Sequence, residues 1–156
     1  MFRAIFLSLC LMLFAYPAIA KNDKIILTVR GKSSSDIQFD AARLEQMPQV
    51  RMTVQTPWYP NPQTFEGPLL RDVLKLAGIE GGNVKIKALN DYAISFPVSD
   101  ALQYDVILAR KHNGKVMSLR EKGPLFLMYP FHKHKELIKT QYFRLCSWQL
   151  NSITAE

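Results

Sequence analysis

The segment from Thr64 to Gly78 constrains the fold of this chain most strongly, because it carries the clearest helix pattern in the sequence. Pro68 suits the first turn of a helix, and Gly78 is a typical residue just past the last turn. Between them, apolar residues recur at the spacing that gives a helix one buried face. This face consists of Leu69, Leu70, Val73, Leu74 and Ala77. We therefore expect the helix to pack against the core through these side chains.

Local signals predict a second, shorter helix over residues 41–46. Asp40 can cap its N-terminus, Phe39 and Leu44 occupy the positions of a hydrophobic staple, and a proline follows its end. Residues 56–64 (TPWYPNPQT) contain three prolines and predict a stiff, irregular loop. Long loops on a rigid scaffold often line binding sites, so this proline-rich loop is a candidate site element.

Most of the remaining chain shows strand patterns. Residues 50–54 alternate between apolar and polar side chains, the apolar run around Leu127 is typical of a buried strand, and Asn113-Gly114 is a strong hairpin signal. The predicted strands cover residues 24–30, 50–54, 84–88, 92–97, 104–111, 115–119, 125–129 and 142–153. Two short helices among many strands, joined mainly by hairpins, predict an α+β domain dominated by β-structure.

The N-terminal segment Met1–Ala20 has the pattern of a secretory signal peptide. Arg3 is followed by an apolar run, and the run ends in a small-x-small cleavage motif before a polar stretch. We expect cleavage after Ala20 and a periplasmic or secreted product, residues 21–156, which is long enough for one domain. No other segment is long and apolar enough to span a bilayer, so we expect no integral membrane segment.

The positive charge of the chain is concentrated in one window. Residues 110–144 contain nine Lys or Arg and two Asp or Glu, a difference of seven that equals the formal net charge of +7. Residues 21–109 are balanced, with ten of each. A solvated face and a basic rim around an anion site both account for this window. No nucleic-acid-binding motif occurs, so we expect no nucleic-acid partner.

Three further segments follow the predicted helix in a fixed order. They are Ala88–Tyr92 (ALNDY), Arg120–Leu125 (REKGPL) and Trp148–Leu150 (WQL). Together with Thr64–Gly78, this ordered set resembles the oxidoreductase molybdopterin-binding domain of the sulfite-oxidase-like proteins, over residues 25–153. The resemblance implies the fold of that family and molybdopterin as the cofactor. It also implies that molybdenum is held by the pterin dithiolene and by one cysteine thiolate.

The position that matches this metal-binding cysteine is occupied by Thr56. A threonine hydroxyl is a hard, weakly acidic oxygen and a poor substitute for a soft thiolate. Cys146, the single cysteine after cleavage, lies in the predicted last strand, where a lone cysteine is usually part of the core. His132 and His134 would share a strand face but lack a third ligand at a suitable spacing. We therefore expect no protein-ligated metal and no cofactor, with molybdopterin as the alternative that the resemblance implies.

Two polar turns remain as candidate binding elements, at residues 90–92 and 120–123. Turn formation alone accounts for both segments, because Asn, Asp and Gly-Pro favour turns. A binding role would make Arg120 and Lys122 donors to a phosphate or carboxylate, with aromatic side chains as stacking walls. The candidate ligand-binding residues are Thr56, Trp58, Tyr59, Asn90, Asp91, Tyr92, Arg120 and Lys122.

These features predict an exported, non-catalytic binding module that has lost the metal-holding thiol. It would bind a small anionic ligand, or act as an accessory to an exported sensor or redox partner protein. The alternative is an enzyme, a molybdopterin-dependent oxidoreductase component in which the protein supplies an oxygen ligand or none to the metal. The residues alone leave both hypotheses open.

Overall fold

The computed structural model describes residues 24–32 and 35–156. The signal peptide expected over Met1–Ala20 lies outside these residues and stays a prediction. Within the described ranges, no helix is long and apolar enough to cross a membrane. The helices are α1 (Ala41–Gln46), α2 (Leu70–Leu76), α3 (Val98–Gln103) and α4 (Thr140–Leu145), with 3-10 turns η1 (Leu119–Glu121) and η2 (Lys135–Leu137). The strands are β1 (Leu27–Arg30), β2 (Ile37–Phe39), β3 (Gln49–Val54), β4 (Gln63–Pro68), β5 (Asn83–Ala88), β6 (Ala93–Pro97), β7 (Ile107–Ala109), β8 (Lys111–His112), β9 (Lys115–Val116), β10 (Phe126–Met128) and β11 (Leu150–Ala155).

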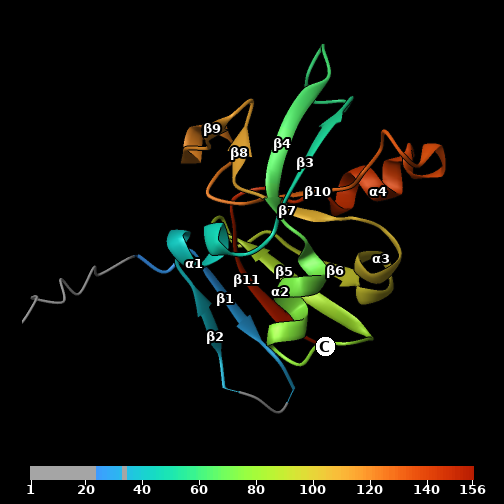
Figure 1. Cartoon of the computed structure of the whole chain (residues 1–156). Helices are drawn as coiled ribbons and strands as arrows, with labels where there is room; N and C mark the ends of the chain where they lie inside the picture. The colour runs from blue at the N-terminus through green and yellow to red at the C-terminus, as the bar shows by residue number, and fades with distance from the viewer. Residues whose placement is uncertain (1–23, 33–34) are drawn as a thin grey trace, which may run out of the picture.

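A five-stranded sheet in the order β2-β1-β11-β5-β6 forms the lower part of the fold in Figure 1. β1 and β11 run parallel, with Val29 opposite Ile153, and the other neighbouring strands run antiparallel. Both of these side chains are fully buried. The strand that comes last in the sequence therefore lies in the middle of the sheet.

A second, four-stranded antiparallel sheet has the order β3-β4-β8-β9, and β7 pairs with β10 beside it. The hairpin of β3 and β4 rises away from the five-stranded sheet (Figure 1). Gly67 allows β4 to pass β7 backbone to backbone, because a Cβ atom at this position would lie 2.0 Å from the carbonyl oxygen of Leu108. No side chain larger than hydrogen fits there without moving one of the strands.

Helix α1 confirms the prediction over residues 41–46. The Asp40 carboxylate accepts a hydrogen bond from the backbone N–H of Arg43 at 2.7 Å, which caps the first turn. Phe39 and Leu44, the two residues of the predicted staple, are fully buried. The start of this helix is thus determined by residues that are adjacent in the sequence.

Helix α2 confirms the helix predicted between Pro68 and Gly78, with one correction to its start. Its core face is buried as expected, and Gly78 follows its end with φ +66°. Pro68, however, is the last residue of β4 and does not lie in the first helical turn, because Leu69 is the N-cap. The buried residues of the face are Leu70, Val73, Leu74 and Ala77, whereas Leu69, also predicted for this face, is only partly buried.

Two further helices, α3 and α4, were not predicted. α4 occupies part of the region where one strand was expected over residues 142–153, and only β11 forms there. Aromatic residues favour strands by propensity, but Phe143 packs against Trp58 at 6.0 Å and Phe131 at 4.9 Å between ring centroids. Tertiary packing overrides the local preference, and Cys146 is the C-cap of α4 and not a strand residue. The strand-dominated α+β class is confirmed, with four short α-helices among the described residues and not two.

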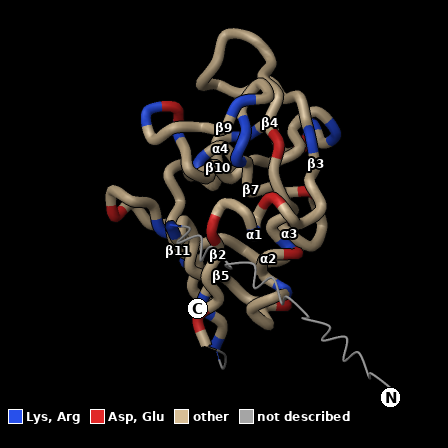
Figure 2. Tube along the Cα trace, turned by 60° about the vertical axis from the view of Figure 1, so that its left-hand side comes forward, with Lys and Arg blue, Asp and Glu red and all other residues tan. Residues whose placement is uncertain are grey.

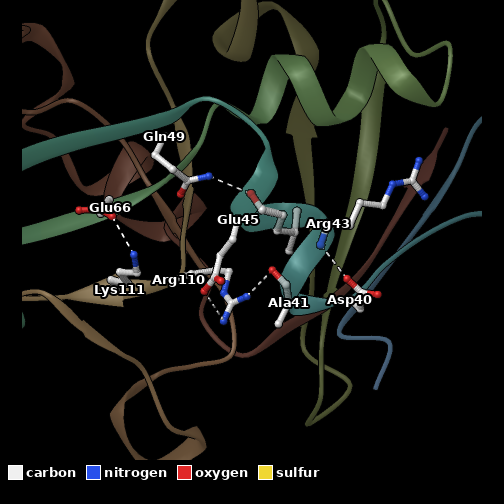
Figure 3. Close-up of polar contacts among 9 residues, drawn as sticks. Asp40, Ala41, Arg43, Glu45, Gln49, Glu66, Arg110 and Lys111 are labelled. Carbon is white, nitrogen blue, oxygen red and sulfur yellow. Dashed lines mark hydrogen bonds and ion pairs between the residues drawn. The ribbon is translucent and has the colours of Figure 1, made fainter. Parts of the chain in front are cut away.

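Arg110 links α1 to the sheets (Figure 3). It interrupts the strand predicted over residues 104–111 and is only 6% exposed. Its Nη1 donates to the carbonyl oxygen of Ala41 at 2.8 Å, and its Nη2 lies 3.5 Å from the Glu45 carboxylate. The neighbouring Lys111 pairs with Glu66 at 3.1 Å. Arg110 and Lys111 therefore stabilise contacts between elements of the fold.

Candidate functional site

A cavity of about 580 Å³ lies between the proline-rich loop, the β5–β6 turn and α4 with the residues after it. We call it the aromatic pocket, because Trp58, Phe143 and Trp148 form much of its lining. Cys146 and Ser147 also line it. Segments that are distant in the sequence therefore build one cavity, of the size typical for small-molecule sites.

The aromatic walls of this pocket hold one another in place. The Trp58 ring centroid lies 6.2 Å from that of Trp148 and 6.0 Å from that of Phe143, both in edge-to-face geometry. Behind them, the buried Phe126 ring lies 5.6 Å from Trp58 and 5.9 Å from Trp148. Edge-to-face pairs at these distances are favourable, so the pocket walls are preformed.

The polar side chains that line the aromatic pocket include Arg144, Asn90 and Ser147, each with a hydrogen-bond donor that has no protein acceptor among the described residues. The guanidinium of Arg144 makes no hydrogen bond or ion pair with any residue in the described part of the chain. The Asn90 side-chain oxygen accepts from the Tyr92 backbone N–H at 3.2 Å, which leaves its amide nitrogen available. Ser147 is 3% exposed, and its Oγ has no partner within the described ranges. Buried hydroxyls normally have a partner, so this one points to a ligand group.

Cys146 contributes a protonated thiol to the same pocket. It is 2% exposed, and burial raises the pKa of its thiol to about 12, with a backbone hydrogen bond from Tyr129 offsetting only part of the effect. A thiol with this pKa is neutral at physiological pH and a weak nucleophile.

Three of the residues predicted as ligand-binding line the aromatic pocket: Trp58, Asn90 and Tyr92. Two others lie beside it. The Lys122 ammonium sits over the Trp148 ring at 4.6 Å from the centroid and lies 5.9 Å from the Tyr59 ring. Lys122 thus places positive charge behind one wall of the pocket.

The other three predicted residues lie outside the pocket lining. Asp91 is highly exposed and pairs with Lys87 at 2.7 Å. Arg120 lies in η1 and is exposed to solvent. Thr56 is 3% exposed, directly before the loop residues that line the pocket, and its Oγ1 has no hydrogen-bond partner in the described part of the molecule.

Phe143, Arg144 and Ser147 were missed by the sequence analysis. They lie within the segment that was predicted to be one strand, and no motif marks them. Trp148 belongs to a segment that carries the family resemblance, but nothing local indicates that it faces Trp58. In the sequence, the only indication of a site at this position is the pair of aromatic residues directly before Arg144.

The residues present do not supply a suitable metal-binding donor set. No group of three or more His, Cys, Asp or Glu side chains in residues 24–32 and 35–156 could hold an ion. Of the two histidines considered, His134 pairs with Glu136 at 3.1 Å. At the position of the family cysteine, Thr56 offers a hard hydroxyl oxygen.

The basic window is partly neutralised in three dimensions. Arg110, Lys111 and Lys133 pair with acidic residues from earlier in the chain, Lys133 with Asp105 at 3.1 Å. Figure 2 shows basic and acidic residues interspersed along much of the trace. The charge surplus therefore does not form one uniform face, and Arg144 is the cation that lines the aromatic pocket.

The structure resembles that of a known oxidoreductase. It matches the crystal structure of the sulfane dehydrogenase SoxCD from Paracoccus pantotrophus with a TM-score of 0.62 and 18% sequence identity, covering 82% of this chain and 37% of that one. The chain thus spans little more than a third of that protein, and the likeness concerns the fold.

No curated protein sequence matches the chain. The sequence model of the oxidoreductase molybdopterin binding domain matches residues 14–139. The chain therefore belongs to the oxidoreductase molybdopterin binding domain family.

Proposed function

We propose that this chain is an exported, non-catalytic binding module that holds a small anionic ligand in the aromatic pocket. The observation that carries the proposal is Arg144, an arginine without a protein partner in the described chain, in a cavity walled by three aromatic side chains. A guanidinium offers paired donors in a plane, which suits carboxylate and phosphate groups.

The polar groups of the pocket support the same ligand chemistry. Besides Arg144, the amide nitrogen of Asn90 and the hydroxyl of Ser147 are available as donors. No Asp or Glu side chain is part of the pocket lining among the described residues. Because Arg144 is positively charged and no carboxylate lines the pocket among the described residues, an anion gains more from this environment than a cation would. The aromatic rings can stack on a planar part of the ligand.

The donor chemistry argues against a molybdenum centre held by the protein. A soft metal loses affinity and redox tuning when a thiolate is replaced by a threonine hydroxyl. Thr56 stands where the family supplies that thiolate, so we expect less than stoichiometric molybdenum even from a host able to make the cofactor. The organic pterin could still bind, since its contacts do not require the thiolate.

A molybdopterin-dependent oxidoreductase is the second candidate, and one observation favours it. The thiol of Cys146 lines the same pocket as Trp58, two residues after Thr56. A metal ion can displace the proton of a coordinating thiol, so the raised pKa of Cys146 does not by itself prevent ligation.

Elemental analysis distinguishes the two candidates. The protein and its Thr56→Cys and Cys146→Ser variants would be purified from a host that makes molybdopterin, and molybdenum measured per chain. The binding module predicts a low content in the unaltered protein, unchanged in Cys146→Ser and raised in Thr56→Cys. About one molybdenum per chain in the unaltered protein, lost in Cys146→Ser, would promote the enzyme to first place.

Ligand capture can be measured separately, because both tryptophans of the chain line the aromatic pocket. Phenyl phosphate should quench their fluorescence more strongly than phenol does. Arg144→Gln should weaken phenyl phosphate binding at least about tenfold, since a charge-assisted hydrogen bond contributes about 1.5–3 kcal/mol. Arg51→Gln, on the exposed face of β3, is the matched control. Equal quenching by phenol, or no effect of Arg144→Gln, would contradict an anion site.

A further inference from the structure

A second cavity, of about 530 Å³, lies on the other side of the β5–β6 turn. Ala88, Asn90 and Tyr92 of this turn line the aromatic pocket, whereas Leu89 lines the second cavity. The start of β1, η1 and β11 supply the other walls. The cavity thus takes different residues from the same turn and is independent of the proposed anion site.

Asn151 reaches this cavity from a bulge in β11. Along the pairing with β5, Leu150 faces Ala88 and Ser152 faces Lys87, so Asn151 is an extra residue that has no opposite partner. Bulges of this kind redirect side chains and are frequent beside functional sites. We name the cavity the bulge pocket after this feature.

The side-chain oxygen of Asn151 is buried and has no hydrogen-bond partner among the described residues. A buried acceptor without a donor is unfavourable, because it has lost its hydrogen bonds to water. The unpaired oxygen is explained if a ligand donates an N–H group to Asn151.

Large apolar side chains surround the bulge pocket and remain exposed. Ile25 is 41% exposed, Leu89 49% and Leu119 55%, and all three line the same cavity. Pro124 and the buried Met117 extend this apolar lining. Apolar side chains gathered around one hollow are typical of a docking surface.

Lys24 brings a positive charge to the lining of the bulge pocket. Arg120 follows Leu119 directly, and neither Lys24 nor Arg120 has an ion-pair partner in the part of the chain described by the structure. The nearby Glu121 carboxylate accepts hydrogen bonds from the backbone and hydroxyl of Ser118 at 3.2 and 2.9 Å. A ligand with negative charge complements this rim.

We propose that the bulge pocket binds a peptide segment of a partner protein that carries an apolar side chain flanked by acidic residues. The apolar side chain fills the hollow beside Leu89 and Leu119, and a peptide N–H donates to the Asn151 oxygen. The acidic residues pair with Lys24 and Arg120. A peptide supplies the amide donor, the apolar group and the negative charge in one extended chain, which a lipid tail does not.

The test uses ¹⁵N-labelled protein and two synthetic probes, acetyl-Glu-Leu-Leu-Glu-amide and its basic counterpart acetyl-Lys-Leu-Leu-Lys-amide. We expect the acidic peptide to shift backbone resonances of Leu89, Leu119 and Asn151, with a dissociation constant of about 1 mM, and the basic peptide to bind at least about fivefold more weakly. Asn151→Leu, which removes the acceptor, should weaken the acidic peptide about fivefold. The control variant Asn61→Leu, in an exposed loop, should bind the acidic peptide as tightly as the unaltered protein does.

A surface variant keeps the proposal testable if Asn151→Leu does not fold. Arg120→Glu should lower the preference for the acidic over the basic peptide. The proposal is overturned if no resonance of the bulge pocket shifts at about 10 mM acidic peptide, or if both peptides bind equally. Sedimentation showing a dimer that Arg120→Glu dissociates would assign the pocket to a second copy of the chain. Resonance shifts confined to residues of the aromatic pocket would refute the peptide site and would leave the proposed anion site standing.

Discussion

Replacing Leu74 by alanine should destabilise the protein strongly, because this side chain is 1% exposed on the core face of α2. The change removes three carbon atoms, and at about 0.8 kcal/mol for each buried methylene this corresponds to about 2.4 kcal/mol. The cavity left behind adds to the loss, for a total of about 2–5 kcal/mol. With a urea m-value of about 2 kcal/mol/M, the unfolding midpoint should fall by at least about 1 M.

The same helix offers a matched control. Leu76 is 52% exposed, and alanine has an equal or better helix propensity, so Leu76→Ala should change the free energy of unfolding by less than about 0.5 kcal/mol. Both variants would be unfolded in urea and followed by far-UV circular dichroism. Equal losses in the two variants, or a neutral Leu74→Ala, would refute the assigned orientation of α2.

Three further predictions concern the thiol, the buried arginine and the glycine crossing. Burial raises the folded-state pKa of Cys146 from its ordinary 9.0 to about 12. The stability that the protonated thiol contributes is therefore complete below pH 9 and should be lost as the pH rises toward 12. The urea unfolding midpoints of the wild type and of Cys146→Ser should converge over this range. Arg110→Met should cost about 1–3 kcal/mol by removing the bond to α1, while Arg51→Met on the exposed face of β3 should be nearly neutral in thermal unfolding. Gly67→Ala should prevent normal folding, and Gly81→Ala, which has open space around it, should not, as judged by the yield of folded protein.

Local chemistry explains which parts of the fold were predicted correctly. α1 was located to the residue, because its cap and its staple are adjacent in sequence. α2 was recognised from its apolar face, and the Asn113-Gly114 turn does join two strands, β8 and β9, with both residues at positive φ. In each case the stabilising contacts lie within a few residues of one another.

The remaining parts depend on contacts between distant segments. The aromatic pocket brings Trp58 next to Phe143 and Trp148, and neither neighbour can be inferred from the residues around it. The same packing makes residues 142–145, the first part of the predicted final strand, helical as the end of α4. This change places Arg144 and Ser147 in the pocket lining. Gly67 lies in a segment that carries the family resemblance, but the close passage of β4 and β7 that requires a glycine there depends on a residue about forty positions away.

The central position of β11 determines the order in which this domain can form. β1 must pair in parallel with β11, whose register places Val29 against Ile153, and β5 must pair with the opposite edge of β11. β11 is synthesised after every other described strand, so the five-stranded sheet cannot close before β11 has been made. Such non-local pairing makes folding slow. If the chain is exported as proposed, slow closure of the sheet would keep the polypeptide unfolded for longer and would thereby favour its transfer across a membrane.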